Sequence, residues 1–455
     1  LSAASGWRGS VGGSWAGESD GVLATGGWED WGDLRSGGGE DWPTSYDGGA
    51  LFGSWVHDLG PGRSLRLTAL ASRQTDVPRT DRLVTGFGQT LPADEVWDYA
   101  LQDRRRYVAA YTDATSGGFA DRFDVRLSLR TYTEERAIRK TGSDELTHER
   151  DEVVTVGLGM DWRKALGEAH LLTWGFDLDH DQVDSSASTT DLGSGSTTAG
   201  DGAFAPDSRY TSGGVFVQDE LLALAPLDVT AGLRWSWFDF GFDPFASSGE
   251  SDSESGSFQA VTASLAAAGD LADGVRLTGV LAQGFRAPNL EDLANESSFF
   301  GGTELPDPDL DPERSLSAQL ALDVTRARWG LSVGVWSTWL EDLIGRRLID
   351  EGDPGQTGDE TYQRANAGRA SLLGADLAAR SRVGGLASPW SVEGTLSWAW
   401  GQQYDDTRDP STGEKPLYDV PFRRIPPLFG RAALVWDGPV SYTHLTLPTM
   451  STTWG

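Results

Sequence analysis

Cysteine is absent from the 455 residues, which excludes disulfide bonds and thiolate metal sites. No run of about 18 apolar residues occurs, so a transmembrane helix is excluded. A membrane barrel is not excluded, because its strands need only about 9–11 residues with alternate ones apolar. Positive charge is scarce, since 37 Lys and Arg stand against 68 Asp and Glu and give a net charge of −31. This balance argues against nucleic-acid binding, which normally needs a basic face.

Enzyme signatures are missing as well. The sequence contains no G-x-S-x-G, H-E-x-x-H or G-x-x-x-x-G-K-[ST] motif, and His148-Glu149 lacks a second histidine at the right spacing. His57, His148, His170 and His180 are dispersed along the chain, as expected for surface or lumen residues rather than metal ligands. We therefore predict no enzymatic activity, no catalytic residue, no cofactor and no metal site.

Glycine and tryptophan are plentiful, with 58 and 19 copies, and strong helix signals are few. This combination favours an all-β chain. Between Asp124 and Arg130, for example, Val125, Leu127 and Leu129 share one face of a strand and charged residues dominate the other. We expect about seventeen strands, at residues 7–16, 22–32, 50–58, 63–74, 96–112, 119–135, 150–162, 169–181, 211–220, 227–239, 257–268, 274–285, 314–325, 330–341, 366–381, 389–401 and 426–436.

The connections between these strands alternate between short and long. Short turns are expected at 60–62, 113–118, 163–168, 221–226, 268–273, 326–329 and 382–388, and long loops at 33–49, 75–95, 136–149, 182–210, 240–256, 286–313, 342–365 and 402–425. An outer-membrane barrel has this asymmetry, with short periplasmic turns and long external loops. The sequence therefore predicts an antiparallel transmembrane β-barrel.

Tryptophans cluster near both kinds of connection. Trp162, Trp329 and Trp390 lie beside short turns, whereas a second group lies nearer the long loops: Trp31, Trp235, Trp237, Trp339, Trp398 and Trp400. Two aromatic belts at the membrane interfaces explain this distribution, and tryptophans in an ordinary buried core are the alternative.

The stretch from Gly284 to Ser315 is the most distinctive part of the chain. An alternating run ends there, Pro288 stops strand pairing because it has no N–H to donate, and a new alternating run starts at Arg314. Its sequence contains two blocks, GFRAPNLEDL followed by PDLDPERS, and we call this stretch the motif loop. The two blocks supply the candidate site residues: Gly284, Phe285, Arg286, Ala287, Pro288, Asn289, Leu290, Asp309, Leu310, Pro312, Glu313 and Arg314.

These two blocks closely resemble the paired signature in the barrel domain of TonB-dependent outer-membrane receptors. Other segments resemble the family in the family's order: Trp31–Arg35, Thr44–Asp47, Asp76–Asp81, Asp342–Ile344, Asn366, Gly374–Leu377 and Phe422–Pro427. The resemblance implies a barrel of 22 strands, of which about seventeen are present, and an N-terminal plug outside this chain. The first and last expected strands both run towards a short turn. Closing a barrel of 22 strands therefore requires an odd number of further strands before Leu1 and an even number after residue 436.

The same resemblance implies a function. The intact protein would sit in the outer membrane of a Gram-negative cell, bind a scarce nutrient at its outer loops and import it with energy from the TonB complex. Ferric siderophore is the default ligand, and haem, cobalamin and oligosaccharide are the alternatives within the family. A passive porin, an adhesin barrel, an outer-membrane enzyme and a soluble secreted β-protein are the other classes. The expected partners are outer-membrane lipid and lipopolysaccharide, the TonB complex through the missing N-terminal part, and a small-molecule ligand, and we expect a monomer.

Roles within the motif loop are open to two readings. Arg286 and Arg314 either pair with Glu291, Asp292 and Glu313 to shape the loop, which we favour, or contact an anionic ligand. Haem receptors of this group are expected to carry a histidine between the two blocks, and residues 289–309 contain none.

Acidic residues crowd three long loops: Asp243, Glu250, Asp252 and Glu254, then Glu304, Asp307, Asp309 and Asp311, then Asp350, Glu351, Asp353, Asp359 and Glu360. We favour solvation and divalent bridging to lipopolysaccharide over capture of a cationic ligand or calcium, because the D-x-D-x-D-G spacing is absent.

The end of the chain stands apart. Residues 440–449 read VSYTHLTLPT, which can be back-translated into a sequence resembling a transposon adapter of sequencing libraries. We therefore assign residues 1–439 to a partial receptor barrel and 440–455 to a non-native tail. No signal peptide is visible at Leu1, so the chain is expected to begin within a longer protein.

Overall fold

The computed structural model describes residues 5–35, 39, 41–86, 90–115, 117–224, 226–245, 252–294, 297–299, 302–352, 360–366, 368–386, 388–405, 419–422 and 424–437. The proposed tail at 440–455 lies outside these ranges, as do parts of the long loops expected at 33–49, 75–95, 240–256, 286–313, 342–365 and 402–425.

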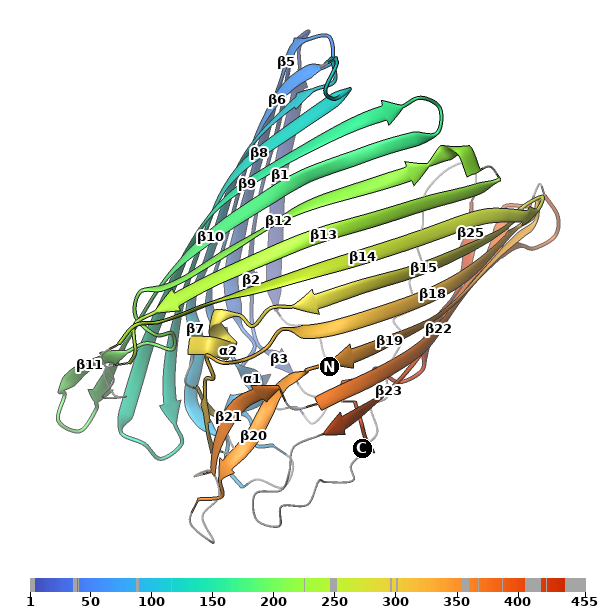
Figure 1. Cartoon of the computed structure of the whole chain (residues 1–455). Coiled ribbons are helices and arrows are strands. Elements are labelled where there is room, and N and C mark those ends of the chain that lie inside the picture. The colour runs from blue at the N-terminus through green and yellow to red at the C-terminus, as the bar shows by residue number, and fades with distance from the viewer. Residues whose placement is uncertain are drawn as a thin grey trace.

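One antiparallel sheet dominates the described chain and curls into a barrel wall (Figure 1). It has nineteen strands, and two of them, β11 and β24, are short additions at its rim, which leaves seventeen long strands. Each long strand from β2 to β23 pairs with the long strand before it and the one after it in the chain. The predicted all-β antiparallel barrel and its seventeen strands are therefore confirmed. Among the described strands, β1 pairs only with β2, and β25 pairs only with β23.

The long strands are β1 (Gly6–Ala16), β2 (Asp20–Trp31), β5 (Tyr46–Gly60), β6 (Arg63–Pro78), β7 (Asp94–Asp113), β8 (Arg122–Lys140), β9 (Glu145–Leu166), β10 (His170–Asp191), β12 (Ser208–Leu221), β13 (Leu227–Phe242), β14 (Glu254–Ala272), β15 (Val275–Arg286), β18 (Glu313–Thr325), β19 (Trp329–Glu341), β22 (Gly368–Arg382), β23 (Trp390–Asp405) and β25 (Phe429–Trp436). The short elements are β3 (Leu34–Arg35), β4 (Asp41–Trp42), α1 (Thr80–Leu83), β11 (Thr197–Asp201), η1 (Leu222–Leu224), α2 (Leu290–Ala294), β16 (Ser297–Phe299), β17 (Gly302–Leu305), β20 (Ile344–Asp350), β21 (Glu360–Asn366) and β24 (Asp419–Pro421). None of the described helices is long and apolar enough to cross a membrane.

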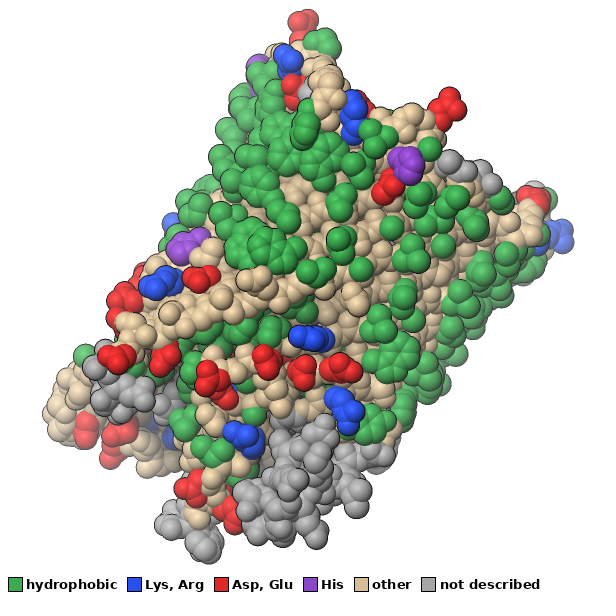
Figure 2. Space-filling model, in the orientation of Figure 1, with side chains coloured by type: hydrophobic (Ala, Val, Ile, Leu, Met, Phe, Trp, Pro, Cys, Tyr) green, Lys and Arg blue, Asp and Glu red, His purple; other side chains and the backbone are tan. Residues whose placement is uncertain are grey.

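The outer face of the sheet is apolar. Side chains alternate between the two faces of a strand, so Leu127 on β8 is exposed outward while its neighbour Arg126 points inward and pairs with Asp161. Figure 2 shows hydrophobic side chains spread over this outer face, with acidic side chains gathered towards the long-loop end. A surface so broad and apolar is suited to lipid, whereas the charged inner face is suited to water.

Exposed aromatic side chains form two groups on the outer face. One lies near the short turns, with Trp15, Phe119, Trp329, Trp390 and Trp436, and the other nearer the long loops, with Trp7, Trp28, Trp235, Trp339, Trp398 and Trp400. Trp31 was expected in the second group, and that expectation is wrong. Its indole Nε1 donates to Glu29 at 3.2 Å on the inner face, where Glu29 also lies 3.8 Å from Arg8.

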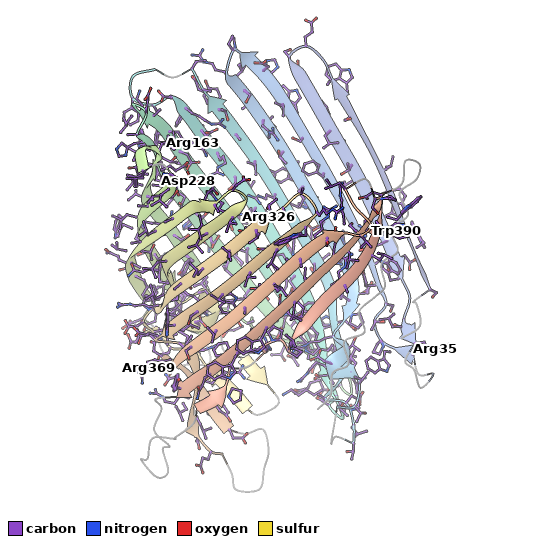
Figure 3. The ribbon with its side chains drawn as sticks, turned by 90° about the vertical axis from the view of Figure 1, so that its right-hand side faces the viewer. Arg35, Arg163, Asp228, Arg326, Arg369 and Trp390 are labelled. Atoms are coloured by element: carbon purple, nitrogen blue, oxygen red, sulfur yellow. The ribbon has the colours of Figure 1, made fainter. Side chains whose placement is uncertain are left out.

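Short and long connections lie at opposite ends of the wall. Figure 3 shows Arg163, Asp228, Arg326 and Trp390 towards the short-turn end, and Arg35 and Arg369 at the other end. Two connections are shorter than the sequence indicated. The loop expected at 136–149 is mostly strand, because β8 runs to Lys140 and β9 starts at Glu145. Likewise, β10 extends to Asp191 and pairs there with β11.

Charge explains why these strand ends were misassigned. Arg136 on β8 pairs with Glu149 at 3.1 Å and with Asp151 at 2.6 Å on β9, and Arg150 contacts Glu135 in the opposite direction. Opposite charges on adjacent strands stabilise a ladder. A polar stretch that reads as a loop therefore continues as the hairpin of β8 and β9 (Figure 1).

Ion pairs on the inner face cross an intervening strand where that strand carries glycine. Arg130 on β8 bonds Asp179 on β10 at 2.5 Å across Gly157 of β9. A Cβ at Gly157 would lie 2.4 Å from the Asp179 carboxylate, so only glycine leaves room for this pair.

In the described part of the wall, pairing between two neighbouring long strands stops early at β14 and β15. The strands β14 and β15 pair from Ala272 only as far as Ser264 opposite Ala282. Beyond that point the Gln283 side-chain oxygen accepts from the Ala263 N–H at 3.2 Å, in place of a backbone carbonyl. A hollow of about 520 Å³ opens between the outer halves of the two strands. The motif loop follows directly from the end of β15.

Candidate functional site

The motif loop turns into a short helix directly after its proline. The Asp292 N–H donates to the Asn289 side-chain oxygen at 3.0 Å, and the Asn289 N–H donates to the Asp292 carboxylate at 3.2 Å. This reciprocal pair resembles a capping box and satisfies two backbone donors at the start of α2. The buried Pro288 carbonyl accepts from the Tyr210 hydroxyl of β12 at 2.8 Å, which ties the loop to the wall.

Helix α2 packs inward against the barrel wall. Leu293 and Ala294 are fully buried, and with Leu290 and Leu310 they join a core cluster with Val183, Ala205, Phe240 and Phe242. Val183 lies on β10, and both phenylalanines lie on β13. The two blocks of the motif therefore meet in one apolar core on the inner face, although a loop separates them.

Arg286 makes polar contacts that hold the same two blocks together. Its guanidinium donates to Asp292 at 2.7 Å and to Glu313 at 3.3 Å, so it joins the two ends of the loop. The Glu313 carboxylate also accepts the Ile344 N–H at 2.8 Å and thereby holds the start of β20. The Asp292 side chain is only 3% exposed, so its charge depends on these partners. This arrangement agrees with the structural reading of Arg286.

Arg314 does not follow the same pattern. It is exposed, and within the described residues no ion pair joins it to Glu291, Asp292 or Glu313, contrary to our expectation. Arg314 instead lines the hollow between β14 and β15, together with Gly284, Phe285 and Pro312. Strand alternation explains the difference, because Arg314 follows Glu313 directly and points to the opposite face.

A second charged cluster lies beyond the helix, in a four-stranded sheet of β16, β17, β21 and β20. Glu304 on β17 is 1% exposed and contacts both Arg346 on β20 and Arg364 on β21. Arg364 also lies 3.7 Å from Asp292 and so connects this sheet to α2. Solvation was the expected state of these loop acids, and for Glu304 that expectation is wrong.

Asn366 connects three segments that the sequence had related only by resemblance. Its amide nitrogen donates to the carbonyls of Asp311 and Asp342, each at 2.8 Å, and its side-chain oxygen accepts the Asp311 N–H at 2.7 Å. Asp342 adopts a positive φ of 56°, which a short polar residue tolerates. Asp309, by contrast, is exposed, and its N–H donates to the Asp307 side chain at 3.0 Å.

The structure thus brings together most of the predicted site residues, and it adds Tyr210, Arg346 and Arg364. No motif marked these three residues in the sequence. Arg346 and Arg364 each lie in an alternating run within a loop, IGRRLID and ETYQRAN, which is the only signal that they stand on strands. In the part of the chain that the structure describes, no group of three or more His, Asp or Glu residues is placed to hold a metal ion.

Comparisons with known proteins bear on this arrangement. A family model described as "TonB dependent receptor-like, beta-barrel" matches residues 4–455. No curated protein matches the sequence.

Several solved structures share the fold at low sequence identity. The copper transporter OprC superposes with a TM-score of 0.74 at 14% identity, covering 96% of this chain and 63% of its own. The FrpB iron transporter from Neisseria meningitidis (F3-3 variant) gives 0.64 at 14% identity, with 89% and 61% covered. The ferric citrate transporter FecA gives 0.63 at 13% identity, with 94% and 60% covered. The chain thus spans less than two thirds of the length of each of these proteins.

Proposed function

Because the chain belongs to the TonB-dependent receptor-like β-barrel family, we propose that it forms the wall and outer vestibule of an outer-membrane receptor for nutrient uptake. The intact receptor takes up a scarce nutrient through the barrel with energy supplied by TonB. As the wall of a transporter, the chain needs no catalytic residue. Its apolar outer face and two aromatic groups support a location in the outer membrane, facing lipid and lipopolysaccharide.

The observation that carries this proposal is the clasp at the long-loop end, made by Arg286, Asp292, Glu313, Glu304 and Arg364 with helix α2. It fixes the loops 286–313 and 342–366 to each other and to the inner face. The described part of the loop 286–313 is folded inward, buried through α2 and held by two charged clusters. Such a loop gives a vestibule a defined shape, which selective ligand capture requires.

A ferric siderophore is the ligand we propose. The names of similar structures include iron and ferric citrate transporters, alongside a copper transporter. Haem is less favoured, because residues 289–309 contain no histidine and three other histidines are engaged elsewhere. His57 and His170 bond Asp20 and Asp219, and His180 bonds Thr211. We further propose that the receptor is a monomer and meets TonB through an N-terminal part outside this chain.

Uptake measurements in cells test the proposal. The complete receptor gene is deleted under iron limitation, and entry of ⁵⁵Fe is followed with citrate, hydroxamate and catecholate chelates. We expect uptake of at least one chelate to be lost on deletion, to be restored by the gene, and to vanish in cells lacking TonB. Flux that persists without TonB would instead support a passive barrel.

A further inference from the structure

Strand β14 has a free backbone edge at its outer end. Between Glu254 and Ala263 it pairs with β13 on one side, whereas its pairing with β15 on the other side reaches only as far as Ser264. β14 therefore continues towards the long loops without a described strand beside it on that side (Figure 1). Among the described residues, no backbone hydrogen bond joins this edge to another segment across the gap.

The free edge turns usable donors and acceptors towards the gap. The Ala263 N–H points there, since it donates to the Gln283 side-chain oxygen at 3.2 Å. Backbone groups of a strand point to alternate sides, so Val261, Gln259 and Ser257 also turn their N–H and C=O groups to the gap. Exposed groups of this kind form a template on which another extended chain can pair.

The free edge lacks the features that usually protect an unpaired strand. Charged side chains, proline and bulges keep exposed edges from pairing with other chains. The run SGSFQAVTA, from Ser255 to Ala263, contains no charged residue and no proline, and its register against β13 is continuous. This part of β14 is therefore suited to strand addition.

The gap begins at the level of the aromatic group nearer the long loops. Val261 stands opposite Trp235 of that group in the register of β13 and β14. Such aromatic side chains mark the membrane interface, and backbone inside that level must be fully paired because hydrocarbon offers no partner. The Gln283 amide closes the membrane end of the gap by accepting the Ala263 N–H. Beyond it, the free edge is within reach of a chain that arrives from the external side.

The gap also offers contacts to side chains. Phe258 stacks on Phe240 with ring centroids 5.5 Å apart, and the Phe285 ring centroid lies 5.4 Å from that of Phe238. These rings give the gap an apolar inner side. Arg314 lines the outer side of the hollow, and the described residues provide it with no ion pair. An added strand would place one row of side chains on the rings and the other row, beside Arg314, outward.

We propose that the gap between β14 and β15 is a docking site for an extended peptide of an external partner protein, which adds to the free edge of β14 as a strand. The peptide carries apolar residues in its inner row and an acidic residue in its outer row. Main-chain hydrogen bonds give strand addition its affinity, and the alternate side chains give it specificity. The site lies in the wall and not in the vestibule, so the proposal goes beyond nutrient uptake and does not depend on it.

The test uses the full-length receptor in lipid nanodiscs, with a synthetic peptide as the probe. The peptide is fluorescent, is as long as the free edge, alternates valine with threonine and carries glutamate in place of one central threonine. Fluorescence anisotropy measures its binding to receptor discs and to empty discs. We expect saturable binding to the receptor discs alone. Equal binding to empty discs would show adsorption to lipid and would overturn the proposal.

Two N-methylated forms of the peptide test the hydrogen bonds directly. Each form carries methyl groups on alternate amides, so that in one form they face β14 and in the other they face away. Because a methyl group removes the donor and blocks the edge, the first form should bind about tenfold more weakly or worse, and the second almost as well as the parent. Equal weakening of both forms, or none, would overturn strand addition.

Receptor variants test the free edge. Val261→Pro removes an N–H that faces the gap and leaves the bonds to β13 in place, so peptide binding should be lost. Val261→Thr is the matched control, because it keeps the N–H and changes only the side chain, and it should bind as the wild type does. Heat-modifiable gel mobility reports folding of each variant. Undiminished binding to folded Val261→Pro would overturn the site, and if this variant does not fold, the N-methylated peptides decide.

Arg314→Gln tests the charge contact. This variant should bind the glutamate peptide about two- to fivefold more weakly than the wild type does, as expected for an exposed ion pair. A peptide with glutamine in place of the glutamate should bind both receptors equally. An equal loss with both peptides would contradict the pairing of Arg314 with an acidic residue.

Discussion

At the scale of single residues, the acids of the motif region fall into two kinds. Asp292 and Glu304 are almost fully buried between arginines. Glu291, in contrast, is 63% exposed, and its contact with Arg364 is long, at 4.0 Å. Burial of a carboxylate is unfavourable unless charges and hydrogen bonds compensate for the lost water. The first kind therefore determines how the loops fold, and the second kind mainly solvates them.

Glu304→Gln should loosen the outer sheet of β17, β20 and β21. Arg346 and Arg364 would face each other without the shared carboxylate, and we expect local opening of these strands to become easier by about 1–3 kcal/mol. Hydrogen exchange of residues 302–305 and 360–366 measures the effect. Glu291→Gln is the control and should leave exchange unchanged. Equal protection in both variants would contradict the role of Glu304.

Gly157→Ala should break the inner-face pair between Arg130 and Asp179. The new methyl group would stand 2.4 Å from Asp179 and 2.5 Å from the Ser128 hydroxyl, so side chains or backbone must shift. We expect a loss of about 1–3 kcal/mol in urea unfolding of the folded barrel. Gly159→Ala is the control on the same strand, since its Cβ would meet Arg126 at an ordinary 3.5 Å. A similar loss in both would point to glycine flexibility and not to the ion pair.

At the scale of elements, the sequence was most informative where one face of a strand is apolar. All seventeen long strands were predicted in place, because alternation of residues such as Leu316 and Leu320 on β18 marks the outer face without reference to the rest of the fold. Strand ends were predicted poorly. Beyond the apolar band both faces are polar, and the hairpin of β8 and β9 is held by pairs such as Arg136 with Asp151, which alternation does not reveal.

In the candidate site, too, local features could be predicted from the sequence and contacts with distant segments could not. The motif located the loop, and local spacing was enough to suggest that Arg286 binds Asp292 or Glu313. The five-residue helix α2 was missed, because so short a helix has no hydrophobic period and shows only its capping pair, Asn289 and Asp292. The partners Arg364 and Tyr210 come from other loops and strands, and their approach depends on the register of the whole wall.

Leu293→Ala should release α2 from the wall. Leu293 is fully buried in the core cluster, and truncation of such a leucine costs about 2–5 kcal/mol, including the cavity left behind. Limited proteolysis within residues 286–313 should become faster while global unfolding changes little. Leu281→Ala, on the exposed outer face of the adjoining β15, serves as the control. Unchanged proteolysis would mean that the helix is held by the charged clasp alone.

At the scale of the whole molecule, the seventeen long strands separate two solvents. Each residue on a strand faces either the apolar outside or the charged inside, so adjacent positions experience opposite environments. The same alternation lets the external loops vary in length without changing the register of the wall, because each strand pairs only with its chain neighbours.

Leu320→Arg and Gln319→Arg compare the two environments directly. Leu320 is 49% exposed on the outer face near mid-strand, and Gln319 points inward beside it. In a lipid bilayer the outer arginine should cost about 2–4 kcal/mol of folding free energy, and the inner one much less. Urea titration of the barrel refolded in liposomes gives both values. Equal costs would contradict the assignment of the two faces.

The break between β14 and β15 has a mechanical consequence. A ring of hydrogen-bonded strands resists widening, because widening must stretch the directional hydrogen bonds between the strands. From Ala263 outward the backbone hydrogen bonds between β14 and β15 end, and the described contact across the gap there is the Gln283 side chain. Tension at the mouth then passes through the core around Phe258, Leu290 and Leu310. Apolar contacts slide without breaking a fixed geometry. The sector between β14 and β15 should therefore widen more easily than the fully paired strands on either side of it.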